Sequence, residues 1–198
     1  MNNIIIKDAI PENSELIAEG ILAAIGEELT MNLAGGKGRE VVKQLFSRLA
    51  VRRDSQYSFM NSRIAYSDKG EPMGVCISYD GADLIKLRRQ FFKEAIETLN
   101  WEITEEEVES LPGETSPDEF YLDTLMTLPH FRGRGVGKAL IIDAFQKAKK
   151  YRKPLGLLCD IDNHKARKLY ESLGFQNKGK RPFAGHIMDH LLLIPHGL

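Results

Sequence analysis

The feature that most constrains this chain is the segment of residues 125–140, LMTLPHFRGRGVGKAL. It passes from a strand-like run through a tight turn into an amphipathic helix. Glycines at positions 133, 135 and 137 leave the backbone amides at the start of that helix accessible to a ligand. Free amides and the positive end of a helix favour an anion, and Arg132, Arg134 and Lys138 add positive charge. The segment therefore predicts a site for a phosphate or pyrophosphate group.

Two common phosphate-binding signatures do not fit this turn. The dinucleotide pattern G-x-G-x-x-G would begin at Gly133 and would require glycine at position 138, which is lysine. The Walker pattern would require glycine in place of Arg132 and Ser or Thr in place of Ala139. What is present is the pattern R-x-x-G-x-G over residues 132–137. This short pattern alone is equally compatible with a turn that holds no ligand.

Hydrophobic periodicity predicts an α/β fold with a mixed sheet. The predicted strands are residues 3–6, 62–67, 73–79, 119–128, 155–161, 175–179 and 185–194. The predicted helices begin after Asn13, after Gly36, at residue 82, after Gly137 and after Asn163. Residues 100–118 are polar and acidic, which indicates a surface excursion with at most a short helix. This order of elements implies a sheet with substantial antiparallel content, flanked by helices.

A second motif, in residues 163–175, consists of Asn163, Ala166, Leu169, Tyr170, Gly174 and Phe175. Together with the turn at 132–137, it resembles the GNAT (GCN5-related N-acetyltransferase) family, whose coenzyme A loop reads R/Q-x-x-G-x-G/A and whose following helix reads N-x-x-A-x-x-L/F-Y-x-x-x-G-F. The element order matches from residue 3 to residue 194. The resemblance implies one GNAT domain over residues 1–198, with a largely antiparallel sheet splayed at the acetyl-CoA site and a helical and loop insertion at about 80–118.

The resemblance also implies where acetyl-CoA would bind. In the family, the backbone of the strand before the loop bonds the pantetheine arm, and a bulge there exposes main-chain groups. The backbone amides of the loop bind the pyrophosphate. The matching residues here are Leu125, Met126 and Thr127 for the strand, Arg132, Gly133, Arg134, Gly135, Val136, Gly137 and Lys138 for the loop, and Asn163 and Ala166 for the next helix.

Tyr170 matches the family's usual general acid, which lies near the acetyl-CoA sulfur. Collapse of the tetrahedral intermediate expels a thiolate, and a phenol can protonate it. The alternative is a core tyrosine without a chemical role, on the apolar face of its helix. By the same resemblance, a backbone N–H near Met126 or Thr127 would polarise the acetyl carbonyl.

The resemblance leaves the general base open. Some family members carry a glutamate on the splayed strand, at the position of Tyr121 in this chain. Strand alternation predicts that Glu119, Tyr121 and Asp123 share one face with Leu125 and Thr127. Asp123 is the predicted base and Glu119 the second candidate, although many relatives use bulk water or no dedicated base.

Composition excludes several other classes of protein. With 27 basic and 28 acidic residues, the chain lacks the basic surface that nucleic-acid binding needs. It has no run of about 18 apolar residues and no signal-peptide pattern at its start, so a cytoplasmic protein without a membrane partner is expected. Cys76 and Cys159 are expected to be reduced core thiols. No metal is expected, since His186 and His190 fall in a strand-like run without further ligands.

The expected function is transfer of acetyl from acetyl-CoA to a primary amine by direct attack in a ternary complex. The acceptor stays open among small amines, amino acids, polyamines, antibiotics and protein N-termini, because fold does not define the acceptor. The alternatives are a non-catalytic acyl-CoA sensor and an interaction module that uses the 80–118 insertion. The insertion is expected to form part of the acceptor site; a packed structural elaboration is the other interpretation. The resemblance is also compatible with a homodimer.

Overall fold

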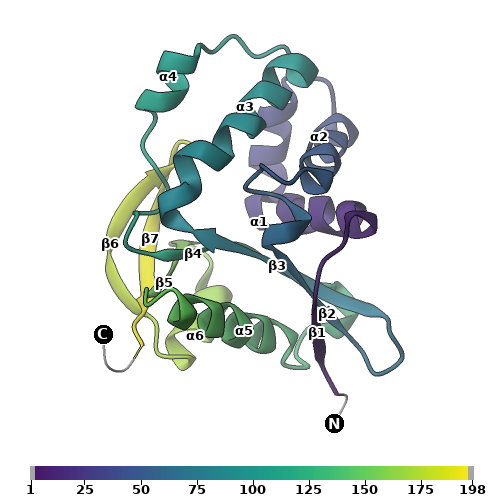
Figure 1. Ribbon diagram of the computed structural model, residues 1–198, viewed down its shortest axis with the longest axis vertical. Coiled ribbons are helices and arrows are strands. Elements are labelled where there is room, and N and C mark those ends of the chain that lie inside the picture. The colour runs from purple at the N-terminus through teal and green to yellow at the C-terminus, as the bar shows by residue number, and fades with distance from the viewer. Residues whose placement is uncertain (1–2, 196–198) are drawn as a thin grey trace.

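The computed structural model describes residues 3–195. Within that range the chain forms a seven-stranded sheet with helices on both faces (Figure 1). The strands are β1 (Ile5–Asp8), β2 (Ser62–Tyr66), β3 (Pro72–Asp80), β4 (Phe120–Thr127), β5 (Leu155–Asp160), β6 (Gln176–Phe183) and β7 (His186–Leu193). The helices are α1 (Ser14–Ala34), α2 (Arg39–Val51), α3 (Leu84–Leu99), α4 (Glu105–Ser110), α5 (Val136–Lys150) and α6 (His164–Ser172). In the described part of the chain, no helix is long and apolar enough to cross a bilayer.

The sheet has the order β1-β2-β3-β4-β5-β7-β6. Its neighbouring strands run antiparallel except for β4 and β5, which are parallel and are connected through α5. The predicted α/β class with a mixed, largely antiparallel sheet is therefore confirmed. The predicted elements agree with these bounds to within a few residues.

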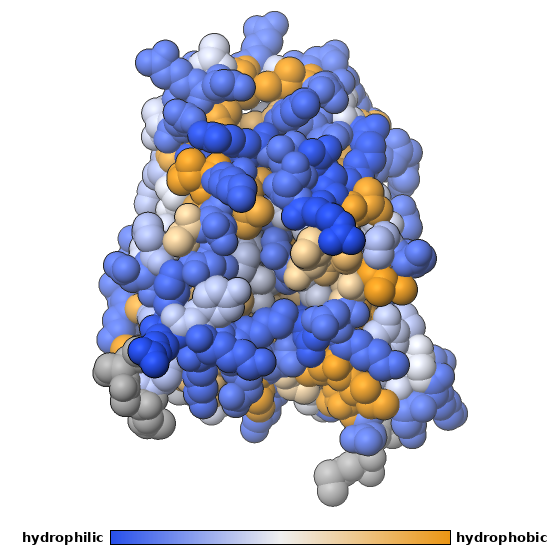
Figure 2. Space-filling view, in the orientation of Figure 1, coloured by the Kyte–Doolittle hydropathy of each residue, from blue (hydrophilic) through white to orange (hydrophobic). Residues whose placement is uncertain are grey.

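Two apolar cores hold the helices against the sheet. Helices α1, α2 and α3 cover one face, where Phe46, Leu49 and Ile77 are fully or almost fully buried. Helices α5 and α6 cover the other, around Leu140 and Leu157, so the two groups of helices lie on opposite sides of the sheet in Figure 1. On the face of the molecule seen in Figure 2, mostly hydrophilic residues surround separate groups of apolar ones.

Both cysteines belong to the core that α5 and α6 cover. Cys76 and Cys159 are buried free thiols. Burial raises the pKa of Cys76 to about 12, so its thiol stays protonated at neutral pH. This agrees with the predicted role of both residues as core thiols.

The parallel strands β4 and β5 separate after a short contact. They pair only at Phe120 with Leu155 and at Tyr121 with Gly156, and beyond these positions the ladder is open. The opening leaves main-chain groups of β4 without a partner on the β5 side, which is the splayed geometry that the family resemblance implied.

A β-bulge lies in β4 at Asp123, two positions before the predicted place at residues 125–127. Thr124 pairs with Ile77 and Leu122 pairs with Ser78, so Asp123 is an extra residue opposite β3. The predicted position of the bulge was therefore wrong.

The bulge also overturns the predicted face of Asp123. An extra residue reverses the inward and outward alternation of a strand. Tyr121 and Met126 consequently pack in the same core, although their positions differ by an odd number, while Leu125 packs in the opposite one. Asp123 bonds Tyr79 on the face of Tyr121, so it does not share a face with Leu125 and Thr127, as was predicted.

Helix α1 contains a break that the sequence analysis did not predict. Gly26 has φ 80° and ψ 171°, and the hydroxyl of Thr30 donates to the Gly26 carbonyl at 2.7 Å. Glycine adopts this positive φ without a Cβ penalty. The predicted interruption at Gly35 ends the helix in the left-handed conformation, whereas the break at Gly26 lies within the helix, next to a cavity that residues of β4 and β5 also line.

Candidate active site

A groove of about 680 Å³ occupies the opening between β4 and β5. Its walls come from both strands, from the start of α5 and from α6. The predicted site residues that line it are Asp123, residues 125–127, Arg132, Gly133, residues 135–138, Asn163, Ala166 and Tyr170. The structure thus brings together two sequence motifs that are separated by a helix and a strand. Of the residues predicted to bind acetyl-CoA, only Arg134 does not line the groove; its guanidinium lies 5.5 Å from the centre of the Phe131 ring.

The turn before α5 presents free backbone amides to this groove. Gly133 and Gly135 have φ of 76° and 83°, and a Cβ at either position would meet no atom within 4 Å. Glycine is therefore required there by the left-handed backbone and not by crowding. The first backbone bond of α5 runs from the Ala139 amide to the Gly135 carbonyl at 3.0 Å, so the amides of residues 136–138 have no partner within the helix. These amides and the helix dipole fit a pyrophosphate.

Asn163 both caps α6 and lines the groove. Its side-chain oxygen accepts a hydrogen bond from the Ala166 amide at 3.1 Å and so caps α6. Both residues also line the groove. The cap fixes the start of the helix that carries Tyr170.

Tyr170 lies on the inner face of α6 and is 8% exposed. Its ring packs against Phe175 with 5.5 Å between ring centroids, and none of the described residues hydrogen-bonds its hydroxyl. Burial raises the pKa of the phenol above its ordinary value, so the group remains protonated at neutral pH. A protonated phenol that lines the groove is suited to give a proton to a leaving group.

Asp123 lines both the groove and a second cavity beside it. Its carboxylate accepts hydrogen bonds from the hydroxyls of Tyr79 and Thr124, each at 2.9 Å. Burial raises the pKa of Asp123, and hydrogen bonds from Thr124, Tyr79 and Gln56 offset only part of this effect. The bulge turns this carboxylate to the α1 side of the sheet, next to the second cavity.

Glu119, the second candidate base, is engaged elsewhere. Its carboxylate lies 3.0 Å from Arg181 Nη2 and 2.9 Å from His190 Nε2. Burial alone would raise the pKa of Glu119, but the hydrogen bond and charge of His190 and the charge of Arg181 outweigh it and hold the pKa below its ordinary value. Glu119 lines neither cavity, and its partners make it an anchor for the chain just before β4.

The second cavity, hereafter the side pocket, has a volume of about 290 Å³. It shares Ala24, Asp123, Leu158, Asp160 and Met188 with the groove, so the two are contiguous. Its other walls come from the break in α1, from β7 and from the chain that precedes β4. Because the side pocket adjoins the groove, it has room for an acceptor molecule next to a ligand in the groove.

Sequence reasoning missed Glu114, which lines the side pocket. The only sequence signal was a carboxylate at the end of the insertion, and nothing in the sequence places it near Asp123. The acidic run at residues 105–107 was the more prominent feature. In the structure that run forms the exposed first turn of α4, closed by a capping box between Thr104 and Glu107, and it lines neither cavity.

The two histidines of β7 lie in different surroundings. His186 lines the side pocket, whereas His190 packs against Glu119. Among residues 3–195, no group of three His, Cys, Asp or Glu side chains is placed to hold a metal ion.

A splayed β4–β5 pair, a glycine turn at a helix start and a tyrosine on the next helix together define an acyl-CoA-dependent transferase fold. The family model described as the acetyltransferase (GNAT) family matches residues 37–175, and the chain belongs to this family. A comparison with curated proteins finds no match.

Solved structures show the same fold. An acetyltransferase crystal structure is 28% identical with a TM-score of 0.74, over 95% of this chain and 97% of the other. An N-acetyltransferase from Staphylococcus aureus Mu50 is 22% identical with a TM-score of 0.75, over 96% and 100%. The NatC complex bound to Gag peptide and CoA contains a chain 17% identical with a TM-score of 0.54, over 98% and 99%.

Proposed function

We propose that this GNAT protein transfers an acetyl group from acetyl-CoA to the nitrogen of a primary amine by direct attack in a ternary complex. The observation that carries the proposal is the contiguity of two cavities, one with free amides for a pyrophosphate and one with carboxylates for an amine. An acyl donor and an acceptor held in contact need no covalent enzyme intermediate.

The groove has separate places for the parts of acetyl-CoA. The amides of residues 133–138, with Arg132 and Lys138 beside them, would hold the pyrophosphate. The open edge of β4 at residues 125–127 would pair with the pantetheine arm, and Asn163 and Ala166 would border it. This arrangement would direct the thioester toward Tyr170 and Asp123, which also line the groove.

The reaction needs three further groups. A backbone amide near Met126 or Thr127 would stabilise the oxyanion of the tetrahedral intermediate. Tyr170 would donate its proton to the departing thiolate. A carboxylate beside the incoming amine would take up the proton of that amine. Asp123 is one such carboxylate, because it lines both cavities.

The proposal places the reaction in the cytoplasm with acetyl-CoA and an amine as partners and without nucleic acid, membrane or metal. Two buried free thiols and a net charge of −1 support it. Because GNAT proteins are often dimers, light scattering on the purified protein would distinguish a monomer from a homodimer.

A thiol-release assay tests the proposal. Purified protein would be incubated with acetyl-CoA and a panel of amines, and mass spectrometry would identify the product. Free coenzyme A together with an acetylated amine is the expected result. Tight acetyl-CoA binding without thiol release for any amine would contradict the proposal and favour a sensor.

A further inference from the structure

The side pocket has an unusually one-sided charge. Its charged lining consists of Asp123, Asp160, Glu114 and, from the break in α1, Glu27 and Glu28. Within the described residues no Lys or Arg side chain lines it, and His186 is its one basic group. Carboxylates gathered at a cavity without a cationic partner favour a ligand that carries positive charge.

Two of these carboxylates form a pair around one amide. Gln56 is 4% exposed, and its Nε2 lies 3.5 Å from both Glu114 Oε1 and Asp123 Oδ2. Its Oε1 has no hydrogen-bond partner among the described residues. The buried amide therefore bridges the two carboxylates through long, uncharged contacts, so both carboxylates can still bind a stronger donor such as an ammonium.

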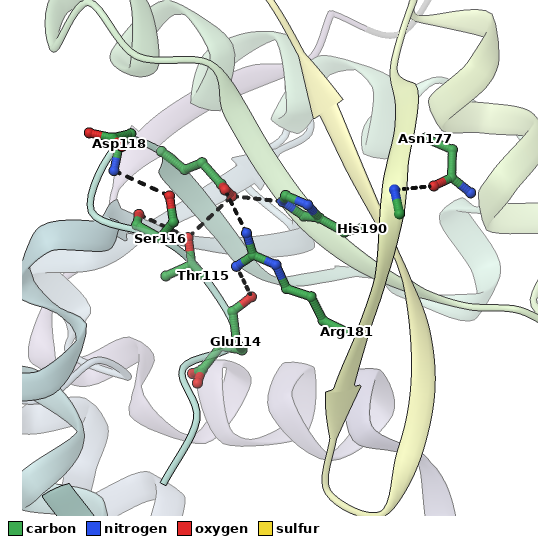
Figure 3. A network of polar contacts seen from close by, with 9 residues as sticks. Glu114, Thr115, Ser116, Asp118, Asn177, Arg181 and His190 are labelled. Carbon is green, nitrogen blue, oxygen red and sulfur yellow. Dashed lines mark hydrogen bonds and ion pairs between the residues drawn. The ribbon is translucent and has the colours of Figure 1, made fainter. Parts of the chain in front are cut away.

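Two arginines outside the pocket fix the position of Glu114. Arg88 of α3 is 4% exposed and donates to the carbonyls of Val108 at 2.7 Å and Leu111 at 2.9 Å, which holds the insertion against α3. Arg181 of β6 donates to the Glu114 carbonyl at 3.3 Å and pairs with Glu119. Figure 3 shows that the side chain of Glu114 points away from Arg181. The insertion thus delivers one carboxylate to the pocket, while Arg88 bonds backbone carbonyls and Arg181 bonds a backbone carbonyl and Glu119.

We infer that the side pocket binds a small cationic primary amine and that Glu114, paired with Asp123, receives the proton that this amine gives up. The inference rests on the proposed acetyl transfer and adds to it the class of acceptor and the proton-accepting residue. It also assigns a function to the insertion between β3 and β4, through its last residues before β4 and not through the acidic run on α4.

The ammonium transfers one proton to the Glu114 carboxylate and becomes a neutral amine, whose lone pair forms the new C–N bond at the thioester carbonyl. The C–S bond then breaks, and its electron pair leaves with the thiolate. Tyr170 protonates the thiolate, and the second nitrogen proton, lost as the amide forms, restores the phenol. Glu114 then releases the first proton to solvent. One acetamide, one coenzyme A thiol and one net proton are the products.

The charges around Glu114 set the pH at which it can act. The charged and titratable groups that face it are Asp123 and Tyr121 of β4, Tyr79 of β3, Tyr57 before β2, Arg88 of α3, Arg181 of β6, Glu27 and Glu28 of α1, Asp160 of β5 and His186 of β7. Burial, reinforced by the negative charge of Asp123, raises the pKa of Glu114 to about 7. Such a carboxylate gains and loses a proton near neutral pH, as a general base should.

The walls of the pocket limit the acceptor further. A volume of about 290 Å³ lies at the lower end of small-molecule sites. Ile25, Leu29 and Phe183 offer apolar contacts for an aliphatic stem. Glu27 and Glu28 are exposed at the break in α1, so a carboxylate on the acceptor would meet like charge there.

Three probes of equal chain length test the acceptor class: n-pentylamine, 1,5-diaminopentane and 5-aminopentanoic acid. They differ only at the end away from the reacting amine, which is a methyl, an ammonium or a carboxylate. We expect kcat/KM for the first two to exceed that for the amino acid by at least about tenfold, or 1.4 kcal/mol. An amino acid that reacts as well as the amines would overturn the cationic pocket.

The variant Glu114→Gln tests the proton-accepting residue, and Glu105→Gln, in the exposed run of the same insertion, is the matched control. We expect Glu114→Gln to lower kcat/KM for n-pentylamine about 10²-fold at pH 7.5 and to remove the rise in kcat/KM with pH near 7. Acetyl-CoA affinity and melting temperature should match those of the control, which shows that the variant folds. If Glu114→Gln keeps the wild-type rate and pH profile, Glu114 does not accept the proton of the amine. The proposed acetyl transfer would not be affected by this result.

A binding measurement separates the inference from the proposed function. Calorimetric titration of n-pentylamine into the protein saturated with coenzyme A should show binding that Glu114→Gln weakens at least about tenfold. If the amine binds in this way but no amine is acetylated, the proposed acetyl transfer and the proton transfer to Glu114 are both wrong. The proposal that the side pocket binds a cationic amine would still stand. Equal amine affinity in wild type and Glu114→Gln would overturn the pocket itself.

Discussion

At the scale of single residues, Tyr170 and the two cavity carboxylates differ in what their surroundings do to them. Tyr170 is surrounded by apolar side chains, so burial keeps its phenol protonated and able to donate. Asp123 and Glu114 lie at a cavity that no Lys or Arg of the described residues lines, and burial raises the pKa of both carboxyls, that of Glu114 to about 7. The different surroundings thus suit Tyr170 to donate a proton and the two carboxylates to accept one.

Replacing Tyr170 by Phe removes the hydroxyl and keeps the ring that packs on Phe175. We expect kcat to fall about 10²-fold with little change in acetyl-CoA affinity, since the group acts on the leaving thiolate. Tyr151→Phe, at a 55% exposed position outside both cavities, is the control and should keep the wild-type kcat. Steady-state rates and melting temperatures of both variants test this role. A stable Tyr170→Phe enzyme with wild-type kcat would show that Tyr170 contributes to core packing and not to the reaction.

At the scale of elements, the junction of β4, the glycine turn and α5 forms the anion site. The turn reverses the chain through two left-handed glycines, and the helix then begins with three amides that its own carbonyls do not reach. The same helix packs Leu140 and Ile141 into the core, which fixes the direction in which those amides point.

The charge of a bound pyrophosphate can be tested at Gly135 with two variants of equal size. Asp and Asn both tolerate the left-handed region better than most residues, and a Cβ there meets nothing within 4 Å. We expect Gly135→Asp to weaken acetyl-CoA binding at least about tenfold more than Gly135→Asn, because only Asp adds negative charge beside the phosphates. Calorimetry on folded variants gives both affinities. Equal losses would indicate that backbone strain and not charge matters there.

At the scale of the whole molecule, one polar network connects the insertion to the end of the chain. Glu119 and His190 are 71 positions apart in sequence, and their side chains are 2.9 Å apart. Arg181 of β6 bonds both Glu119 and the carbonyl of Glu114, and Figure 3 shows Arg181 and His190 together beside the chain that precedes β4. The network holds the chain before β4 against the C-terminal hairpin, and so it maintains one wall of the side pocket.

Glu119→Gln should destabilise the protein in a pH-dependent way. The folded-state pKa of Glu119 lies below its ordinary value of 4.5, so its stabilisation is present above that pH and disappears as the pH falls through the lower, folded-state pKa. Removing one partner of a buried pair costs about 3 kcal/mol, or roughly 6–12 °C in melting temperature for a domain of this size.

Melting curves of wild type and Glu119→Gln between pH 3 and pH 8 measure this effect. The difference should be nearly constant from pH 6 to pH 8 and shrink below about pH 4. Glu109→Gln, which breaks an exposed pair with Arg89, is the control and should cost less than about 1 kcal/mol at every pH. A difference between wild type and Glu119→Gln that persists unchanged at pH 3 would mean that the carboxylate charge does not contribute.

The class of fold, the order of the elements and most of the groove could be predicted from the amino-acid sequence. These features depend on local patterns: periodicity defines strands and helices, glycines permit the turn before α5, and Asn163 caps the helix of Tyr170. Each pattern acts over a few residues, so it can be recognised without knowledge of what packs against it. The splay of β4 from β5 came from the family resemblance and not from the residues.

Only the tertiary structure decided the acceptor side of the site. The bulge at Asp123 depends on how β4 pairs with β3, and it reversed the face on which the carboxylate lies. Glu114 reaches the side pocket because Arg88 and Arg181 hold the insertion from two different elements. Pairing register and long-range anchors arise from contacts between segments far apart in the chain, and no local pattern in the sequence encodes them.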